Sequence, residues 1–399
     1  MRVLYAEAVY GKEEISAVLG VLENSPHLLM SGENVKLFES KVAKLFGKKY
    51  GVMVNSGSSA NLLSINILNL PTGSEVITPA LTFSTTVAPI VQNGLVPAFV
   101  DVESSSFVID CELIEEMITP KTKAMLIPNL IGNLPDWDKL RMLSDKYGLV
   151  LIEDSADTIG YKFNGNNTGN LSDIVTSSFY ASHIITAAGF GGMFCTNNLE
   201  LAEKAVVSRS WGRASSLKNE SESIDERFNS EVDGIEYDAK FMFNSIGYNF
   251  IPSELSAAFG LEQLKRLKKY KIIRQKNYSL LLDTFSKIEK FFVLPTQLSN
   301  VDTPMLAFPF IIRDDAPFSR RELQVFLEKK DIQTRTIFTG NILRHPGFKG
   351  IKRKESSSGY PNSDLVMRGG MLIGCHHGMD QKQLDFVQSS IEEFSSKFR

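Results

Sequence analysis

Short apolar runs alternate with helix-length segments along the first half of the chain. Between residues 49 and 197, β-branched and other apolar residues gather in runs of four to six. The seven predicted strands are residues 50–55, 75–78, 96–100, 124–128, 150–153, 174–179 and 192–196. Strands that alternate with helices form parallel sheets covered on both faces, so we expect an α/β fold with a seven-stranded, mostly parallel sheet sandwiched by helices.

The second half of the chain has a different order of elements. A helical pattern rich in Leu and Lys spans residues 253–285, a strand follows at 305–312, and helices follow at 319–330 and 380–398. This order predicts a smaller C-terminal α+β domain over residues 251–399, after a large α/β domain over residues 1–250 that includes an N-terminal segment. The polar stretch 215–236 is expected to be a surface excursion.

Composition narrows the classes of partner. The 399 residues are 43% hydrophobic and 22% charged, as in a globular protein, and 43 Lys and Arg face 46 Asp and Glu. The resulting net charge of −3 offers no basic excess for nucleic acid or an anionic membrane. No apolar stretch approaches the length of a membrane span, and charges stand where a signal peptide would be apolar. We therefore expect a cytoplasmic protein that binds a small molecule.

The chain has three cysteines, Cys111, Cys195 and Cys375, which are far apart in the sequence. An odd number of scattered cysteines favours a reducing compartment and argues against a structural zinc site. We therefore predict no metal site.

The first candidate motif is NSGSSA at residues 55–60, between a predicted strand and a predicted helix. Gly57, Ser58 and Ser59 would present backbone N–H groups and the positive end of the helix dipole to a phosphate. Serine is also a preferred helix cap, so this motif alone leaves capping and phosphate binding open.

Two further motifs follow predicted strands. Asp154 and Asp157 come at the end of the strand at 150–153, where ligands of α/β sheets bind, although acids there also cap helices. His183 ends the segment SSFYASH at 177–183 and precedes the glycines of GFGG at 189–192. A lone histidine is usually structural. The glycines strengthen the case for a functional one, because small residues let the backbone approach a ligand closely, but this motif alone leaves both interpretations open.

The three motifs together resemble the DegT/DnrJ/EryC1/StrS family of pyridoxal-phosphate sugar aminotransferases, over essentially the whole chain. The resemblance implies the PLP-dependent transferase fold type I and a homodimer with shared active sites. The implied cofactor contacts are Gly57, Ser58, Ser59 and Ser178 at the phosphate, Phe83 on the ring, Asp154 at the ring nitrogen, and Asn249 at the cofactor of the partner subunit.

The chain departs from this family at one position. His183 stands where its aminotransferases carry the lysine that binds the cofactor covalently, and no lysine occurs between Lys162 and Lys204. An imidazole forms no stable imine, but it moves protons at neutral pH. This departure resembles the sugar 3-dehydratase branch. It implies alternation between pyridoxal and pyridoxamine phosphate, L-glutamate as amino donor, a nucleotide-linked 4-keto-6-deoxyhexose as substrate, and release of ammonia.

Other segments resemble the same branch. Asp157 stands where dehydratases have an acid near the phenolic oxygen of the cofactor. The segments 129–133, 210–213 and 339–344 are similar as well, which implies substrate contacts at Arg213, Asn341 and Arg344.

The resemblance also distinguishes two kinds of dehydratase. Residues 214–217 contain no cysteine where the iron–sulfur kind carries its ligands, and three scattered cysteines cannot hold such a cluster. The similarity is therefore to the kind that acts alone on a GDP-linked 4-keto-6-deoxymannose in the synthesis of colitose, a lipopolysaccharide O-antigen sugar.

Two alternative functions stay open. The chain could be a nucleotide-sugar aminotransferase that uses a lysine from elsewhere, such as Lys162 or Lys240, or a catalytically inactive member that binds sugar nucleotides. His376 and His377, which follow a strand-like segment, either contact substrate or form an ordinary turn.

Overall fold

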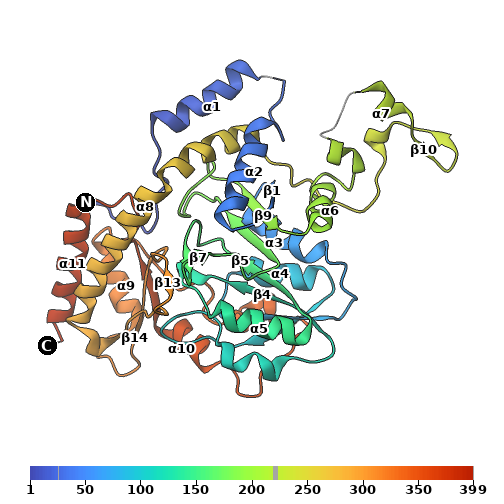
Figure 1. Cartoon of the computed structure of the whole chain (residues 1–399). Coiled ribbons are helices and arrows are strands. Elements are labelled where there is room, and N and C mark those ends of the chain that lie inside the picture. Colours follow the sequence, from blue (N-terminus) through green and yellow to red (C-terminus); the bar gives the residue numbers. More distant parts are fainter. Residues whose placement is uncertain (26, 219–222, 399) are drawn as a thin grey trace.

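The main sheet of the computed structural model, which describes residues 1–25, 27–218 and 223–398, has seven strands (Figure 1). Their order is β1 (Tyr50–Val54), β9 (Gly192–Thr196), β8 (Ile174–Ser178), β5 (Val150–Asp154), β4 (Thr122–Pro128), β2 (Glu75–Pro79) and β3 (Val96–Val100). Neighbours are parallel except around β9, which is antiparallel to both β1 and β8. The predicted α/β fold and its mostly parallel sheet are confirmed.

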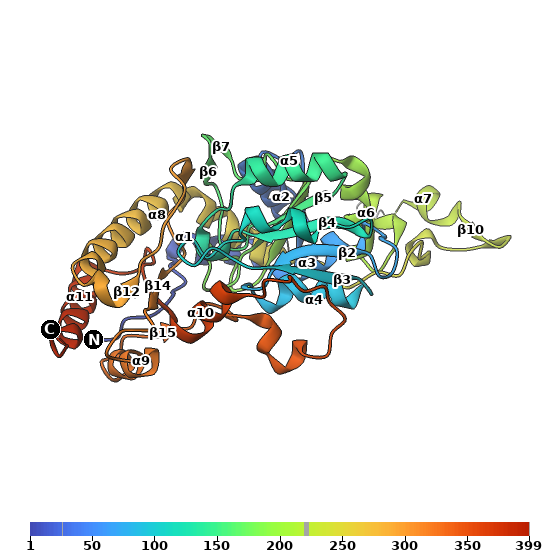
Figure 2. The same ribbon diagram turned by 90° about the horizontal axis from the view of Figure 1, so that it is seen from below.

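Helices cover both faces of this sheet (Figure 2). One face carries α2 (Glu33–Leu45) and α5 (Trp137–Tyr147), and the other carries α3 (Gly57–Asn66), α4 (Ser84–Gln92) and α6 (Leu199–Arg209). Along β4, Met125 packs on the α5 side and Leu126 on the α3 side. Successive side chains of a strand point to opposite faces, so burial on both faces explains the continuous apolar runs in the sequence.

The C-terminal half forms a separate antiparallel sheet. Its order is β12 (Phe292–Val293), β14 (Phe308–Ile312), β16 (Gly370–Ile373) and β15 (Thr334–Arg335). It packs through a phenylalanine-rich core against α8 (Glu254–Ser286), α9 (Arg320–Lys329) and α11 (Gln381–Ser396), and α10 (Pro361–Gly369) precedes β16. The predicted helices are confirmed. The predicted strand begins at Phe308 rather than residue 305, because the Leu306 N–H bonds the Ile131 carbonyl instead of a neighbouring strand.

Segments cross the predicted domain boundary at residue 251 in both directions. Val3, before α1 (Lys12–Asn24), pairs in parallel with Ile332 and is buried in the core of the C-terminal sheet. In the opposite direction, Glu254 at the start of α8 accepts the N–H of Val35 at 2.9 Å. The division into residues 1–250 and 251–399 stays a prediction.

The predicted surface excursion projects from the body of the molecule (Figures 1 and 2). It contains α7 (Ile224–Phe228) and a hairpin of β10 (Glu231–Val232) and β11 (Ile235–Glu236), while residues 219–222 lie outside the described part. A small sheet of β13 (Val301–Asp302), β6 (Lys162–Phe163) and β7 (Asn166–Asn167) completes the strands of the described residues. Among those residues, no helix is both long and apolar enough to cross a membrane.

His376 and His377 are buried behind β16. The ring of His376 bonds the Leu4 carbonyl through Nε2 at 3.1 Å, and Nδ1 of His377 accepts from Nε of Arg274 at 3.1 Å. Burial, followed by the Arg274 charge, lowers the pKa of His376 to about 4 and that of His377 to about 2. Both rings are therefore neutral in the folded protein at neutral pH.

This burial predicts loss of stability in mild acid. Between pH 6.5 and 4 the unfolded chain binds protons that the folded chain excludes, so the free energy of unfolding should fall as pH falls. The loss should be about 2 kcal/mol per histidine at pH 5. Urea unfolding at pH 7 and pH 5 measures it, with the exposed His27→Asn as control. A His377→Asn protein that keeps the full pH dependence would contradict the prediction.

Candidate active site

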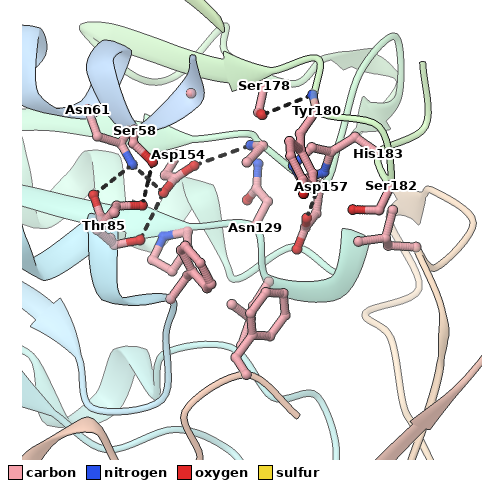
Figure 3. Close-up of a pocket in the computed structure, with 18 of the residues that line it drawn as sticks. Ser58, Asn61, Thr85, Asn129, Asp154, Asp157, Ser178, Tyr180, Ser182 and His183 are labelled. Carbon is pink, nitrogen blue, oxygen red and sulfur yellow. Dashed lines mark hydrogen bonds and ion pairs between the residues drawn. The ribbon is translucent and has the colours of Figure 1, made fainter. Parts of the chain in front are cut away.

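A cavity of about 630 Å³ lies at the carboxyl ends of the parallel strands and is closed by C-terminal residues. The predicted site residues that line it are Gly57, Ser58, Phe83, Asp154, Asp157, Ser178 and His183. Figure 3 shows Ser58 and Asp154 at one end of this cavity and His183 with Asp157 at the other. The structure therefore brings together most of the residues that the motifs predicted.

Helix α3 begins at Gly57. Ser56 is its N-cap, because its Oγ accepts the N–H of Ser59 at 3.1 Å. Ser58 lines the cavity and donates to Oγ1 of Thr85 at 2.9 Å, whereas Ser59 does not line it. Ser56 therefore caps the helix, and Ser58 is the serine within the first helical turn that faces the cavity. Phosphate contacts by Ser58 and Ser59 stay predictions.

The first turn of α3 lies directly against Ser178. A Cβ on Gly57 would be 2.5 Å from Cβ of Ser178, closer than real contacts allow. The absence of a side chain at Gly57 lets the helix N-terminus and the Ser178 hydroxyl face the same end of the cavity.

Gly57→Ala is expected to separate these two groups. The added methyl must push the helix or Ser178 away, so affinity for pyridoxal phosphate should fall about tenfold. Titration of the cofactor by absorbance measures the loss. Gly347→Ala is the matched control, because open space surrounds that position. Equal cofactor affinity in the two variants would refute this account.

Asp154 is a buried carboxylate that faces the cavity. One oxygen accepts from Nδ2 of Asn61 at 2.8 Å and Oγ1 of Thr86 at 3.0 Å, and the other accepts from the N–H of Ala156 at 3.2 Å. Burial raises the pKa of Asp154, and the bonds from Asn61 and Thr86 oppose this rise. No Lys or Arg of the described residues forms an ion pair with it, so the site fits a ligand that brings a cation, such as a protonated ring nitrogen.

Asn61 and Thr86 were not predicted. The available signal is the position of Asn61, a polar residue on the buried side of α3 between Ala60 and Leu63. A buried amide on an apolar face needs a partner, and here the partner is Asp154.

His183 enters the other end of the cavity from the loop after β8. Its Nδ1 lies 3.4 Å from Oδ1 of Asp157, and this nitrogen makes no hydrogen bond with the residues that the structure describes. No lysine lines the cavity within those residues. Lys162 bonds Oδ1 of Asn167 at 2.6 Å, and Lys240 lies just after the projecting segment, in the short helix Ala239–Phe241.

C-terminal residues complete the cavity wall. The ring of Phe338 meets that of Phe83 edge to face, with centroids 6.2 Å apart. Arg335 is the one Lys or Arg among the described residues that line the cavity. Nothing in the sequence indicated either residue. Arg335 belongs to a strand of only two residues, which is too short to show a hydrophobic period, and Phe338 follows that strand.

The other predicted contacts lie outside this cavity. Asn249 is exposed and pairs with Ser210, and the guanidinium of Arg213 lies 4.4 Å from the centre of the Trp211 ring. Nδ2 of Asn341 donates to Asp364 at 2.8 Å, and Arg344 forms an ion pair with the same carboxylate. Substrate contacts by Arg213, Asn341 and Arg344 therefore stay predictions.

The three cysteines are buried free thiols in three different clusters of the core. His376 and His377 do not line the cavity either, and they pack against α8 and the N-terminal segment instead.

A family model described as the DegT/DnrJ/EryC1/StrS aminotransferase family matches residues 9–392. The chain belongs to this family. The match spans both the main sheet and the C-terminal sheet, and it includes every residue that lines the cavity except Tyr5.

Relatives within the family include two sugar 3-dehydratases. A dTDP-4-dehydro-2,6-dideoxy-D-glucose 3-dehydratase of Saccharopolyspora spinosa is 36% identical, over 92% of this chain and 82% of that protein. A GDP-4-keto-6-deoxy-D-mannose 3-dehydratase of Escherichia coli O55:H7 is 31% identical, over 97% of this chain and 98% of that protein. These two enzymes act on sugars linked to different nucleotides.

A solved structure gives the same fold. The crystal structure of a GDP-4-keto-6-deoxymannose 3-dehydratase with a trapped PLP-glutamate geminal diamine superimposes with a TM-score of 0.86 at 31% identity. The superposition covers 98% of this chain and 100% of that one. The fold predicted from the resemblance is therefore confirmed.

Proposed function

We propose that this chain is a 3-dehydratase dependent on pyridoxal and pyridoxamine phosphate. Its substrate would be a nucleotide-linked 4-keto-6-deoxyhexose, with GDP-4-keto-6-deoxymannose as the first candidate. L-Glutamate would supply the amino group, and the products would be 2-oxoglutarate, ammonia and the 3-deoxy-4-keto sugar. The observation that carries the proposal is His183, which enters the cavity where the aminotransferases of the family have lysine, while no lysine lines the described cavity.

The residues of the cavity have separate tasks. Gly57, Ser58 and Ser178 would bind the cofactor phosphate, Phe83 would pack on the ring, and Asp154 would keep the ring nitrogen protonated. When bound, the cofactor supplies an amine for the C4 ketone of the sugar and a ring that takes up an electron pair.

His183 would act as the base. It would accept a proton at Nε2 and deliver one to the departing C3 hydroxyl of the sugar. Arg335 places a positive charge in the same cavity, where it is suited to a carboxylate of glutamate.

Three measurements on the purified holoenzyme test the proposal. Glutamate should yield one equivalent of 2-oxoglutarate per site, and a 4-keto-6-deoxy sugar should then release ammonia. Borohydride should attach no cofactor to the protein. Covalent attachment to a lysine would indicate an aminotransferase, and absence of 2-oxoglutarate would indicate an inactive sugar-nucleotide binder. Comparison of GDP-, dTDP- and CDP-linked sugars would identify the nucleotide.

The proposed enzyme is a homodimer that shares its active sites through Asn249. Asn249 is exposed beside α6 and does not line the cavity of its own chain, which supports a role in a partner's cavity.

Mixed dimers test this sharing. Asn249→Ala and His183→Asn should each inactivate the enzyme, but refolding the two together places an intact His183 beside an intact Asn249 in one site of each mixed dimer. About a quarter of the parent activity should return, since half the dimers are mixed and half of their sites are intact. No recovery, with mixed dimers demonstrated by mass spectrometry, would place Asn249 in its own subunit's site or outside both.

A further inference from the structure

Asp157 lies between the histidine and a neighbouring loop. Its Oδ2 accepts the backbone N–H of Ile131 at 2.8 Å, while Oδ1 lies 3.4 Å from Nδ1 of His183. One carboxylate oxygen is thus fixed by the main chain and the other is turned toward the imidazole, as the contact in Figure 3 shows. A proton on Nδ1 would point at this oxygen and would leave Nε2 free to accept another.

The backbone that fixes Asp157 has an unusual conformation. Ile131 has φ 59° and ψ 14°, in the left-handed region that β-branched residues rarely adopt. Such a conformation persists where the surroundings hold it, and Ile131 is held at both ends. Its N–H bonds Asp157, and its carbonyl accepts the N–H of Leu306 at 2.6 Å.

Leu306 is in turn held by a buried arginine. Nη1 of Arg274 donates to the Leu306 carbonyl at 2.8 Å, and Nε donates to Nδ1 of His377 at 3.1 Å. Arg274 is 1% exposed, and no carboxylate of the described residues forms an ion pair with it. Burying a charge without a counter-ion costs free energy of folding. What Arg274 provides in return is its two directional hydrogen bonds, which fix Leu306 and His377 in place.

We infer that Asp157 is the positioning residue of His183, and that Arg274 holds this arrangement from the C-terminal half through Leu306 and Ile131. The inference rests on the proposed function only in taking His183 as the base. It adds a role for Asp157 that fixes which ring nitrogen carries the proton, and a remote role for Arg274.

Asp157→Asn gives the sharpest test, because it preserves the shape of the side chain. The amide oxygen would accept from Ile131, and the NH₂ group would turn toward Nδ1 of His183. Nδ1 would then be an acceptor, so the proton of the neutral ring would move to Nε2. Histidine ¹⁵N spectra report this tautomer directly, and the signal of His183 is assigned by its loss in His183→Asn.

The expected results distinguish a role in positioning His183 from a general loss of structure. Asp157→Asn should switch the neutral His183 ring from the Nδ1–H to the Nε2–H form. It should lower kcat of the glutamate half-reaction about 100-fold, with KM for glutamate within about twofold. Arg274→Lys keeps the charge but cannot make both bonds, so it should give a mixture of tautomers and a fall in kcat of about threefold to tenfold. Arg209→Lys, at a buried arginine paired with Glu39, should change neither the His183 tautomer nor kcat.

Two results would overturn the inference. One is an unchanged His183 tautomer in Asp157→Asn, and the other is an equal effect of Arg209→Lys and Arg274→Lys. The tautomer is measured without turnover, so it decides the inference even if glutamate is not converted. Conversely, a tautomer switch in a protein that converts no glutamate would defeat the proposed function and leave the positioning role standing.

Discussion

A His183→Asn protein is expected to bind pyridoxal phosphate as the parent does and to convert glutamate about 1,000-fold more slowly, since a positioned general base contributes about 10²–10⁴-fold. Binding should survive because Ser58 and Asp154 lie at the far end of the cavity from His183. Single-turnover formation of 2-oxoglutarate measures the rate, and absorbance titration measures the affinity.

The neighbouring Ser182→Ala is the matched control, because Ser182 also lines the cavity but carries no base. His183→Lys extends the test, since borohydride should then attach the cofactor covalently and dehydration should be lost. Full activity in His183→Asn would remove His183 from the mechanism and would leave the proposed dehydratase without a base.

Asp154→Asn is expected to have little effect on the stability of the cofactor-free protein and a large effect on cofactor binding. In the free protein, relief of a buried charge offsets one lost hydrogen bond, so the free energy of unfolding should change by less than about 1 kcal/mol. In the bound protein, the charge-assisted contact to the ring nitrogen is gone, which should weaken cofactor affinity about 10- to 100-fold. Turnover should fall further, about 1,000-fold, because the ring nitrogen no longer stays protonated.

Glu153→Gln provides the contrast for this prediction. Glu153 is the adjacent buried acid, but it bonds Asn129, Ser155 and Ser172 and does not line the cavity. Loss of the Glu153 carboxylate should change the free energy of unfolding and leave cofactor affinity unchanged. Equal cofactor affinity in Asp154→Asn and the parent would show that the carboxylate does not face the ring nitrogen.

The sequence was sufficient for the main sheet and for one side of the cavity. The strands were predictable because burial on both faces demands continuous apolar runs, as in Ile174–Ser178. Asp154 and His183 were predictable because they follow such strands, and the carboxyl ends of parallel strands meet at one edge of the sheet. Local pattern and topology made these two residues candidates, and the resemblance to the family gave them their expected roles.

The C-terminal wall of the cavity depends on long-range packing that produces no recognisable pattern in the local sequence. Arg335 and Phe338 reach the cavity because the C-terminal sheet docks on the main one, and Ile131 adopts its conformation only because Asp157 and Leu306 hold it. The hydrogen-bond and ion-pair partners of individual side chains could not be predicted from the sequence either. The partner of Asn341 and Arg344 is Asp364, which lies about 20 residues further along the chain and has no motif around it.

The parallel pairing of Val3 with Ile332 has a consequence for synthesis on the ribosome. A ribosome adds about 5 to 20 residues per second, so roughly 15 to 65 s pass between the synthesis of Val3 and that of its partner Ile332. The strands from Tyr50 to Thr196 can pair during that time, whereas the core around Val3 cannot close. Apolar residues of this core therefore stay exposed on the nascent chain until translation is nearly finished, and we expect chaperone binding to be concentrated in that interval.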